Sequence, residues 1–392
     1  ANMQVTKKPL SLLLILLISI MLSSCKSQKA EWKGTIEEID GVTVVKNPKE
    51  PKYIDKTIIL KEDISIGVDE GDENYMFSAP VDIESDSEGN IYVLDFREIT
   101  IRKYNSNGIF ERNISRKGQG PGELEYPIGF CVSSQDLIYI ADVMERKIEV
   151  LDPNGEFQRA INLNDLVDQI SINDSDEIII NYDIAVQKDK NIRKRISKIG
   201  KFDFQNNVIS DFFSKEKPLF KGIQSRGYRV ETPYERFDID TRGNVYVGTT
   251  NEYEIYVYSP TGELFLKFST VYEPIPRDAE IMAKVMNQLS KSSSPKELPK
   301  YKELVGNYRV FNSISIDEKD RAWIGLFQPL GENEVRKLSH FDVFSPNGEF
   351  LYEVKIPRDI QRQLTFKNGY VYALATNEAG YSRVLRLRLE EN

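Results

Sequence analysis

The sequence predicts an all-β fold, a six-bladed β-propeller built from four-stranded antiparallel blades. Three observations predict it. One kind of turn recurs six times, a second kind recurs five times in alternation with the first, and a strand-like segment precedes the first repeat. Because repeat architectures grow without splitting, a repeat region of about 340 residues need not divide into several domains.

The first kind of turn is acidic or polar and leads into a strand rich in β-branched and aromatic residues. Its clearest copies are Asp86–Val93 and Asp240–Val247. Weaker copies begin at Gln135, Asp174, Asp317 and Lys367. We expect each copy to join the first strand of a blade, strand a, to the second, strand b.

The second kind of turn places proline or a polar residue before asparagine or threonine and then glycine. Proline presets φ for a type I turn, and glycine takes the left-handed position that lets the strand pair continue through a bulge. We expect these turns to join strands c and d. The five copies are Tyr104–Phe110, Leu151–Phe157, Tyr258–Leu264, Phe344–Phe350 and the degenerate Phe204–Val208.

The unequal numbers of the two turns predict how the ring closes. The last repeat ends after its third strand, Val384–Leu387, and therefore lacks strand d. The segment Lys56–Leu60 alternates well enough to supply it. An N-terminal strand paired with the C-terminal blade would leave no open sheet edges at this junction.

The N-terminal residues predict export. Lys7 and Lys8 precede the apolar run Leu10–Leu22, which is too short to span a bilayer as a helix. The sequence Leu22-Ser23-Ser24-Cys25 resembles the bacterial lipobox, and this resemblance implies cleavage before Cys25 and a diacylglycerol on its thiol. An ordinary signal peptide with a chance cysteine is the alternative. Lipidation would place the protein in the cell envelope, anchored in the outer membrane at its periplasmic or external face.

These signals divide the chain into a lipoprotein signal peptide at 1–24, a tether or linker at 25–54 and the propeller at 55–392. A helical insertion is expected at about 275–305, because Ile281, Val285 and Leu289 recur at helical spacing. Met282 and Met286 follow the same spacing. The helix could cap the propeller by packing or cover a ligand.

One repeat carries a family resemblance. It comprises Gly118–Leu124, Tyr126–Gly129, Leu137–Asp142 and Ile148–Asp152, and it resembles an NHL repeat. Over roughly residues 55 to 390 the chain is similar to six-bladed β-propeller lipoproteins of unknown function. The resemblance implies the architecture and says little about chemistry.

Composition excludes several kinds of function. Loss of Lys7 and Lys8 with the signal peptide moves the formal charge from −9 to −11, so nucleic acid is not an expected partner. Cys131 lies in an apolar stretch and is expected in the core without an internal disulfide. His340 is the sole histidine, which excludes a histidine-rich metal site or a Ser-His triad.

We therefore expect no catalytic residue, no metal and no cofactor. The alternative is a calcium-dependent lactonase-type hydrolase, because gluconolactonase-type propellers, which this fold resembles, place acidic ligands around the central channel. In this sequence Asp82 and Glu235 lie at the beginning of two predicted first strands, but two scattered carboxylates are weak evidence for calcium. The glycine-rich segment Gly118–Glu123 lacks the lysine and the strand-to-helix setting of a P-loop, so we expect a rigid turn.

Long b–c and d–a connections should leave the ring on one face, which predicts that this loop-rich face binds a partner. Arginine forks suit carboxylates, phosphates and sugar acids, and tyrosine can stack on a sugar or peptide. Pairing of the arginines with nearby acids is the alternative. We predict a monomeric binding or scaffold propeller for a protein, peptide or glycan. The candidate residues are Arg97, Arg116, Arg146, Tyr182, Arg226, Tyr228 and Arg236.

Overall fold

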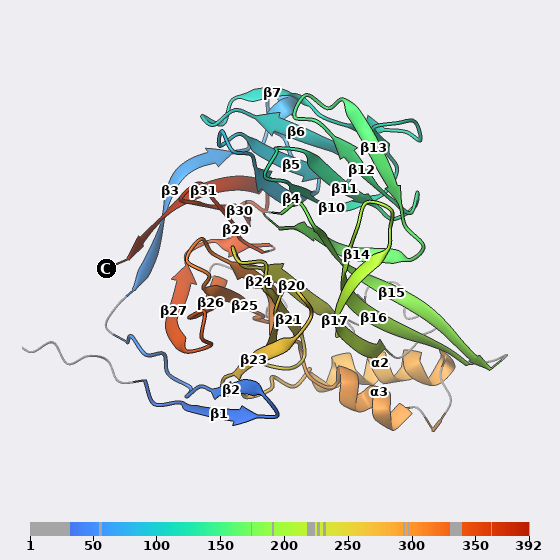
Figure 1. Cartoon of the computed structure of the whole chain (residues 1–392), viewed down its shortest axis with the longest axis vertical. Helices are drawn as coiled ribbons and strands as arrows, with labels where there is room; N and C mark the ends of the chain where they lie inside the picture. Colours follow the sequence, from blue (N-terminus) through green and yellow to red (C-terminus); the bar gives the residue numbers. More distant parts are fainter. Residues whose placement is uncertain are drawn as a thin grey trace, which may run out of the picture. The chain divides into compact units, whose positions relative to one another are not determined.

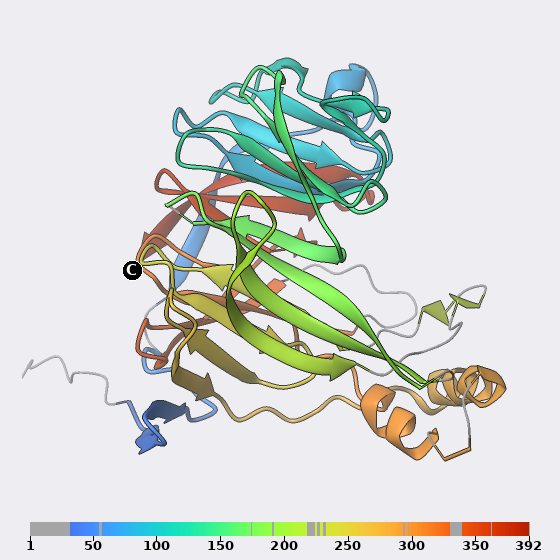
Figure 2. The same cartoon turned by 45° about the vertical axis from the view of Figure 1, so that its right-hand side comes forward.

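The structure is a computed structural model, and Figures 1 and 2 show it in two views. The described residues are 32–54, 57–173, 175–189, 192–217, 224–225, 228–229, 233–292, 295–296, 298–329, 339–361 and 363–391. Residues 33–392 make up one compact unit. The predicted signal peptide and Cys25 lie outside the described residues. Within the described parts, no helix has the length and apolar character needed to cross a bilayer.

Six antiparallel sheets form the blades, as predicted. Blade 1 contains β4 (Pro80–Ser85), β5 (Ile91–Asp95), β6 (Thr100–Tyr104) and β7 (Phe110–Asn113). Blade 2 contains β10 (Pro127–Val132), β11 (Ile138–Asp142), β12 (Lys147–Leu151) and β13 (Phe157–Asn162). Blade 3 contains β14 (Leu166–Ile172), β15 (Ile178–Asp189), β16 (Ile192–Phe202) and β17 (Val208–Lys217).

The second half of the chain completes the set. Blade 4 contains β20 (Glu235–Ile239), β21 (Val245–Thr249), β22 (Glu254–Tyr258) and β23 (Leu264–Ser269). Blade 5 contains β24 (Phe311–Ile316), β25 (Ala322–Leu326), β26 (Ser339–Phe344) and β27 (Phe350–Ile356). Blade 6 contains β28 (Asp359–Ile360), β29 (Thr365–Lys367), β30 (Tyr370–Thr376), β31 (Ser382–Glu391) and β3 (Ile58–Ile66).

The innermost strands of the blades form a closed ring. Each contacts the next in the order β4, β10, β14, β20, β24 and β29, and β29 contacts β4. Short elements lie in the connections. They are the 3-10 helix η1 (Glu73–Tyr75), the parallel pair β8 (Arg116–Lys117) and β9 (Glu123–Leu124), and the pair β18 (Gln224–Ser225) and β19 (Tyr228–Arg229).

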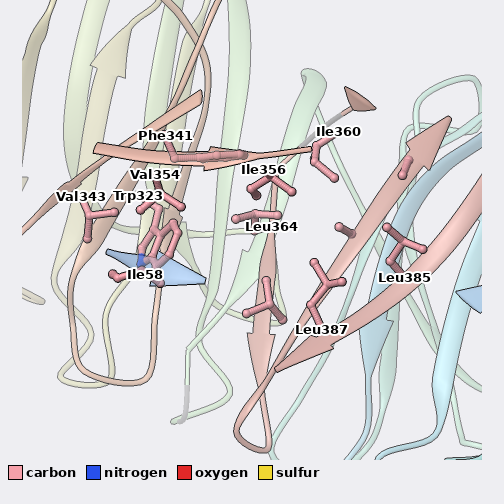
Figure 3. Packing of buried hydrophobic residues seen from close by; sticks show 13 residues of the cluster. Ile58, Trp323, Phe341, Val343, Val354, Ile356, Ile360, Leu364, Leu385 and Leu387 are labelled. Atoms are coloured by element: carbon pink, nitrogen blue, oxygen red, sulfur yellow. The ribbon is translucent and has the colours of Figure 1, made fainter. Parts of the chain in front are cut away.

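The predicted closure of the ring is confirmed. Strand β3 is the fourth strand of blade 6 and pairs with β31, from Ile58 opposite Glu391 to Ile66 opposite Val384. It continues past the predicted segment. At one end Ile58 joins the apolar cluster around Trp323 in blades 5 and 6 (Figure 3). At the other end Ile66 packs with core residues of blades 1 and 6.

Both kinds of turn form as predicted, and side chains fix them. Asp86 opens the first a–b turn, and its carboxylate accepts the backbone N–H groups of Glu88 and Asn90. In the c–d turn of blade 2, Gly155 has φ +89°, and a Cβ there would lie 2.4 Å from the carbonyl oxygen of Ile114. Register shifts of the expected bulge type occur in all five c–d hairpins.

The tether predicted at 25–54 is wrong for its second half. β1 (Thr35–Ile39) and β2 (Val42–Lys46) form a hairpin, and β2 pairs in parallel with β23 at the outer edge of blade 4. Asn47 then bonds to blades 4 and 5. Its Nδ2 donates to the carbonyls of Ser269 at 3.1 Å and Gly348 at 2.8 Å, and its Oδ1 accepts the N–H of Phe350 at 2.7 Å. The segment therefore belongs to the propeller.

The predicted helical insertion is present between blades 4 and 5. It consists of α2 (Ala279–Ser292) and α3 (Leu298–Val305). Val285 and Leu289 of α2 pack against Tyr301 and Val305 of α3. The two helices thus share a small apolar core of their own, which explains the helical spacing seen in the sequence.

Closure of the ring can be tested with one buried and one exposed residue of β3. Ile66 is 2% exposed and Ile59 is 42% exposed. We expect Ile66→Ala to lower the free energy of unfolding by about 2–5 kcal/mol, because it leaves a cavity in the core. Ile59→Ala should cost about 1 kcal/mol or less. Urea denaturation measures both, and equal losses would contradict the placement of β3.

The seam between blades 4 and 5 contains a buried acid. Asp342 on β26 accepts a hydrogen bond from the hydroxyl of Tyr253, which lies in the b–c turn of blade 4. Burial raises the pKa of Asp342 to about 7, although the bond from Tyr253 opposes this rise. The folded protein therefore holds this proton more tightly than the unfolded chain does, since the ordinary pKa of aspartate is about 3.9.

This raised pKa predicts a pH dependence of stability. The contribution of protonated Asp342 is fully present below about pH 4 and is lost as the pH rises through about 7. We expect Asp342→Asn, which cannot ionise, to gain stability relative to the natural protein between pH 5 and pH 8. Urea unfolding of both proteins across this range measures the difference. Parallel stability profiles would show that Asp342 does not titrate as described.

Candidate functional site

The inner strands line a central channel with two tiers of side chains. One residue in each inner strand, or directly before it in blade 6, is buried between blades: Ile83, Phe130, Ile170, Phe237, Ile314 and Leu364. Because side chains alternate along a strand, the preceding residues share the opposite face and surround a cavity of about 280 Å³. We call them the mouth tier: Asp82, Gly129, Gln169, Arg236, Ser313 and Gln363.

A second tier lies two residues later in these strands. Its members line a separate cavity of about 330 Å³. We call them the floor tier: Glu84, Cys131, Ser171, Asp238 and Thr365. The inner strands begin at the d–a connections, so the mouth tier belongs to the loop-rich face and the floor tier to the face of the a–b turns.

Strand irregularities add further residues to the lining of the mouth. In four blades the first strand carries a register shift at its beginning, which leaves one extra residue without an opposite partner. These residues all line the mouth cavity, and they are Val81, Ile128, Asp168 and Asn312. In blade 6 the strand is interrupted between β28 and β29, where Gln361 and Gln363 line the cavity. Bulges often re-aim side chains beside functional sites.

The tier side chains also join neighbouring blades. Asp82 accepts the N–H of Phe130 at 3.0 Å, which links blade 1 to blade 2. Gln169 donates to the carbonyl of Phe237 at 2.7 Å, which links blade 3 to blade 4. On the floor side Thr365 donates to the carbonyl of Ile83 at 3.0 Å and links blade 6 to blade 1. The residues that shape the cavity therefore also fix the ring.

Arginine and aromatic side chains stack at one side of the mouth. The guanidinium of Arg236 lies 4.2 Å from the ring centre of Tyr234. Arg309 donates to the hydroxyl of Tyr234 at 2.9 Å, and its guanidinium lies 4.6 Å from the ring centre of Phe327. Tyr308 stacks on Phe327 with ring centres 5.5 Å apart. Such stacking on aromatic rings fixes the orientation of a guanidinium group.

The floor tier is electrostatically different. Burial raises the pKa of Glu84 well above its usual value, and the charge of Asp82 adds to this rise. Burial likewise raises the pKa of Asp238 to about 7, against the effect of the N–H bonds from Ile316 and Ile239. Burial also raises the pKa of the Cys131 thiol. The floor tier thus contains acidic groups that hold their protons more tightly than ordinary carboxyl groups do, with Lys367 lining the same cavity.

The predicted site residues separate into different places. Arg236 lines the mouth cavity. Arg97 and Arg146 are exposed on the b–c turns of blades 1 and 2, away from the residues that line the mouth cavity. Arg116 is exposed and pairs with Glu123 at 2.8 Å, as the alternative of local pairing anticipated. Arg226 lies outside the described residues, as does the side chain of Tyr228.

The prediction for Tyr182 is wrong. The residue lies within β15, is 4% exposed and stacks edge to face on Phe202 with ring centres 5.2 Å apart. Its hydroxyl donates to Asp211 at 3.2 Å. Strand β15 runs further than the sequence signals suggested, and Tyr182 shares the buried face of Ile178 and Ile180. A ligand on the surface cannot stack on this ring.

The glycine-rich connection of blade 1 is a turn filled by an acid. The carboxylate of Glu123 accepts the N–H of Gly120 at 2.9 Å and pairs with Arg116. A Cβ at Gly118 would lie 2.1 Å from a carboxylate oxygen of Glu123. Because a carboxylate already occupies this loop, the loop does not form a phosphate cradle, as expected from the sequence.

The two acids considered for calcium have other partners. Asp82 accepts backbone N–H groups of Ile83 and Phe130. Glu235 is buried and lies 2.7 Å from the ammonium of Lys217. Across the described parts of the chain, no three histidine, cysteine or carboxylate side chains gather closely enough to hold a metal ion.

Comparisons with known proteins agree on the fold. A protein of Bacteroides fragilis assigned as exported is 15% identical with a TM-score of 0.55, and the match covers 88% of this chain and 99% of that one. A DUF4221 member from Bacteroides vulgatus is 12% identical with a TM-score of 0.56, over 86% and 99% of the two chains. A gluconolactonase of Xanthomonas campestris, at 10% identity over 86% and 91%, has a TM-score of 0.44, too low to support an argument about activity.

No curated protein matches the sequence. Residues 71–232 match the model of a family described as a 6-bladed β-propeller, DUF5128. The chain is therefore a six-bladed β-propeller, and within that fold its first three blades carry the signature of this family.

Proposed function

We propose that the protein is an exported lipoprotein of the cell envelope, anchored through Cys25, that binds a protein, peptide or glycan partner at its loop-rich face. The observation that supports this most is the mouth cavity, where stacked Arg236 shares the lining with polar side chains from blades 1, 3, 5 and 6. Pockets with a few converging polar groups are the usual place for recognition. A binding role uses this chemistry without requiring a nucleophile or a metal.

The alternative of a calcium-dependent hydrolase receives less support. The two acids that suggested it, Asp82 and Glu235, are bonded to backbone N–H groups and to Lys217. A histidine base is absent from the channel lining of the described residues, since His340 lies on β26. Turnover of lactone substrates by the purified protein after calcium addition would support the hydrolase alternative.

Lipid anchoring predicts a change of fractionation. In the natural protein the envelope membranes should retain the chain, whereas Cys25→Ser should release it into the soluble exported fraction, because the acyl chains supply the membrane affinity. Detergent partitioning and immunoblotting of cell fractions measure this. Cys131→Ser is the matched control, because Cys131 is buried in blade 2 and should leave the fractionation unchanged. Retention of both variants in the membrane would contradict anchoring through Cys25.

Binding at the mouth predicts a loss of partner capture. The full chain, extracted gently from membranes, should retain a partner or glycan that Arg236→Gln captures at least about tenfold less, as expected for loss of a charged hydrogen bond. Arg116→Gln is the matched control, because Arg116 is exposed and pairs within its own loop. Quantitative mass spectrometry and glycan profiling of the retained material provide the measurement. Equal capture by both variants would place binding elsewhere.

A further inference from the structure

We propose that the mouth cavity binds a hexuronic acid, a monosaccharide with one carboxylate and several neighbouring hydroxyl groups. This inference rests on the proposed binding function and names the ligand of the same site. In the complex, Arg236 holds the carboxylate, while the amide and hydroxyl side chains of the mouth bind the sugar hydroxyls.

The size of the cavity favours a single sugar unit. Its volume is about 280 Å³, which is just below the range of about 300–1,000 Å³ found for typical small-molecule sites. An extended oligosaccharide or a folded peptide segment needs more enclosed space than this. A monosaccharide, either free or at the end of a glycan, can enter it.

The charges around the cavity favour a carboxylate over a phosphate. Arg236 and Arg309 supply positive charge to the cavity, whereas Asp82 in blade 1, across the ring, and Asp168 in blade 3, next to blade 4, supply negative charge. A phosphate monoester carries close to two negative charges and would be repelled by both acids. A uronate carries one negative charge for the arginines, and its hydroxyl groups can donate to the aspartates.

Arg236 is prepared to bind a planar anion. One face of its guanidinium is covered by Tyr234, so the group is held in place while its N–H donors remain in the plane. Its hydrogen bonds to backbone carbonyls are long, 3.3 Å from Nε to Asn312 and 3.5 Å from Nη1 to Glu235. These distances are at the weak end for hydrogen bonds, so a carboxylate can compete for the same donors.

A buried acceptor beside Arg236 points to a hydroxyl donor. The side-chain oxygen Oδ1 of Asn312 is buried and has no hydrogen-bond partner among the described residues. An unsatisfied buried acceptor is costly, and a ligand hydroxyl would satisfy it. Asn312 lines the cavity at one of the strand irregularities and its backbone carbonyl accepts from Arg236, so the carboxylate and hydroxyl sites are adjacent.

The apolar side of a sugar ring has a place as well. Val81 and Ile128 line the mouth at the extra positions of blades 1 and 2. Because Tyr234 is stacked against Arg236, the C–H face of the sugar packs on the aliphatic side chains of Val81 and Ile128 instead. The specificity therefore resides in the carboxylate and the hydroxyl groups.

Calorimetric titration of the full chain in detergent tests the inference. The probes are glucuronate, galacturonate, glucose and glucose 6-phosphate, with a glucuronide to represent the end of a glycan. We expect saturable binding of at least one uronate, at least about tenfold tighter than glucose or glucose 6-phosphate, consistent with one charged hydrogen-bonded pair. Arg236→Gln should weaken uronate binding at least about tenfold, and Arg116→Gln should leave it unchanged.

The folded state of each variant is checked by its thermal unfolding temperature, and Arg236→Lys, which keeps the charge, gives a second variant for the same site. Equal binding of glucose and the uronates, absence of uronate binding at millimolar concentration, or unchanged binding by Arg236→Gln would overturn the inference. Loss of partner capture by Arg236→Gln without uronate binding would overturn the sugar-acid ligand but leave the proposed binding function standing. Failure of both experiments would reject both.

Discussion

The pairing of β3 with β31 is the constraint on which the rest of the structure depends. Strand β3 supplies the outer strand of the last blade, and the hydrogen bond from Thr365 to Ile83 joins the inner strands of the last and first blades. Each inner strand is positioned by contacts with the inner strand of the next blade. If the ring were open, the inner strands at the opening would lose these contacts. The mouth cavity collects residues from all six blades and can exist only in the closed ring.

The same inner-strand side chains serve both the ring and the cavity. Asp82 and Gln169 line the mouth, but they also bond to the backbone of the next blade. These bonds leave them fewer hydrogen-bonding positions for a ligand. Arg236 differs, because Tyr234 stacks on one face of its guanidinium while its hydrogen bonds to backbone carbonyls are long. The recognition chemistry therefore concentrates at Arg236, beside the seam between blades 4 and 5.

Local signals predicted the fold because each turn is specified by a few adjacent residues, as the bonds of Asp86 show. The β1–β2 hairpin carried a similar signal in Asp40-Gly41, with φ of +51° and +80°, but its pairing with β23 is not encoded locally. Tyr182 was assigned to the surface because the length of β15 was underestimated. Arg309 and Asn312 were missed because they become neighbours of Arg236 only when blades 4 and 5 meet.

The described N-terminal segment fastens the half of the ring to which Arg236 and Arg309 belong. After β2 pairs with blade 4, Asn47 bonds to blade 5, and β3 then completes blade 6. One continuous stretch of chain thus fastens three consecutive blades along their outer edges. Arg236 and Arg309 belong to blade 4 and to the connection that leads into blade 5, so this stretch braces the seam at which their side chains meet.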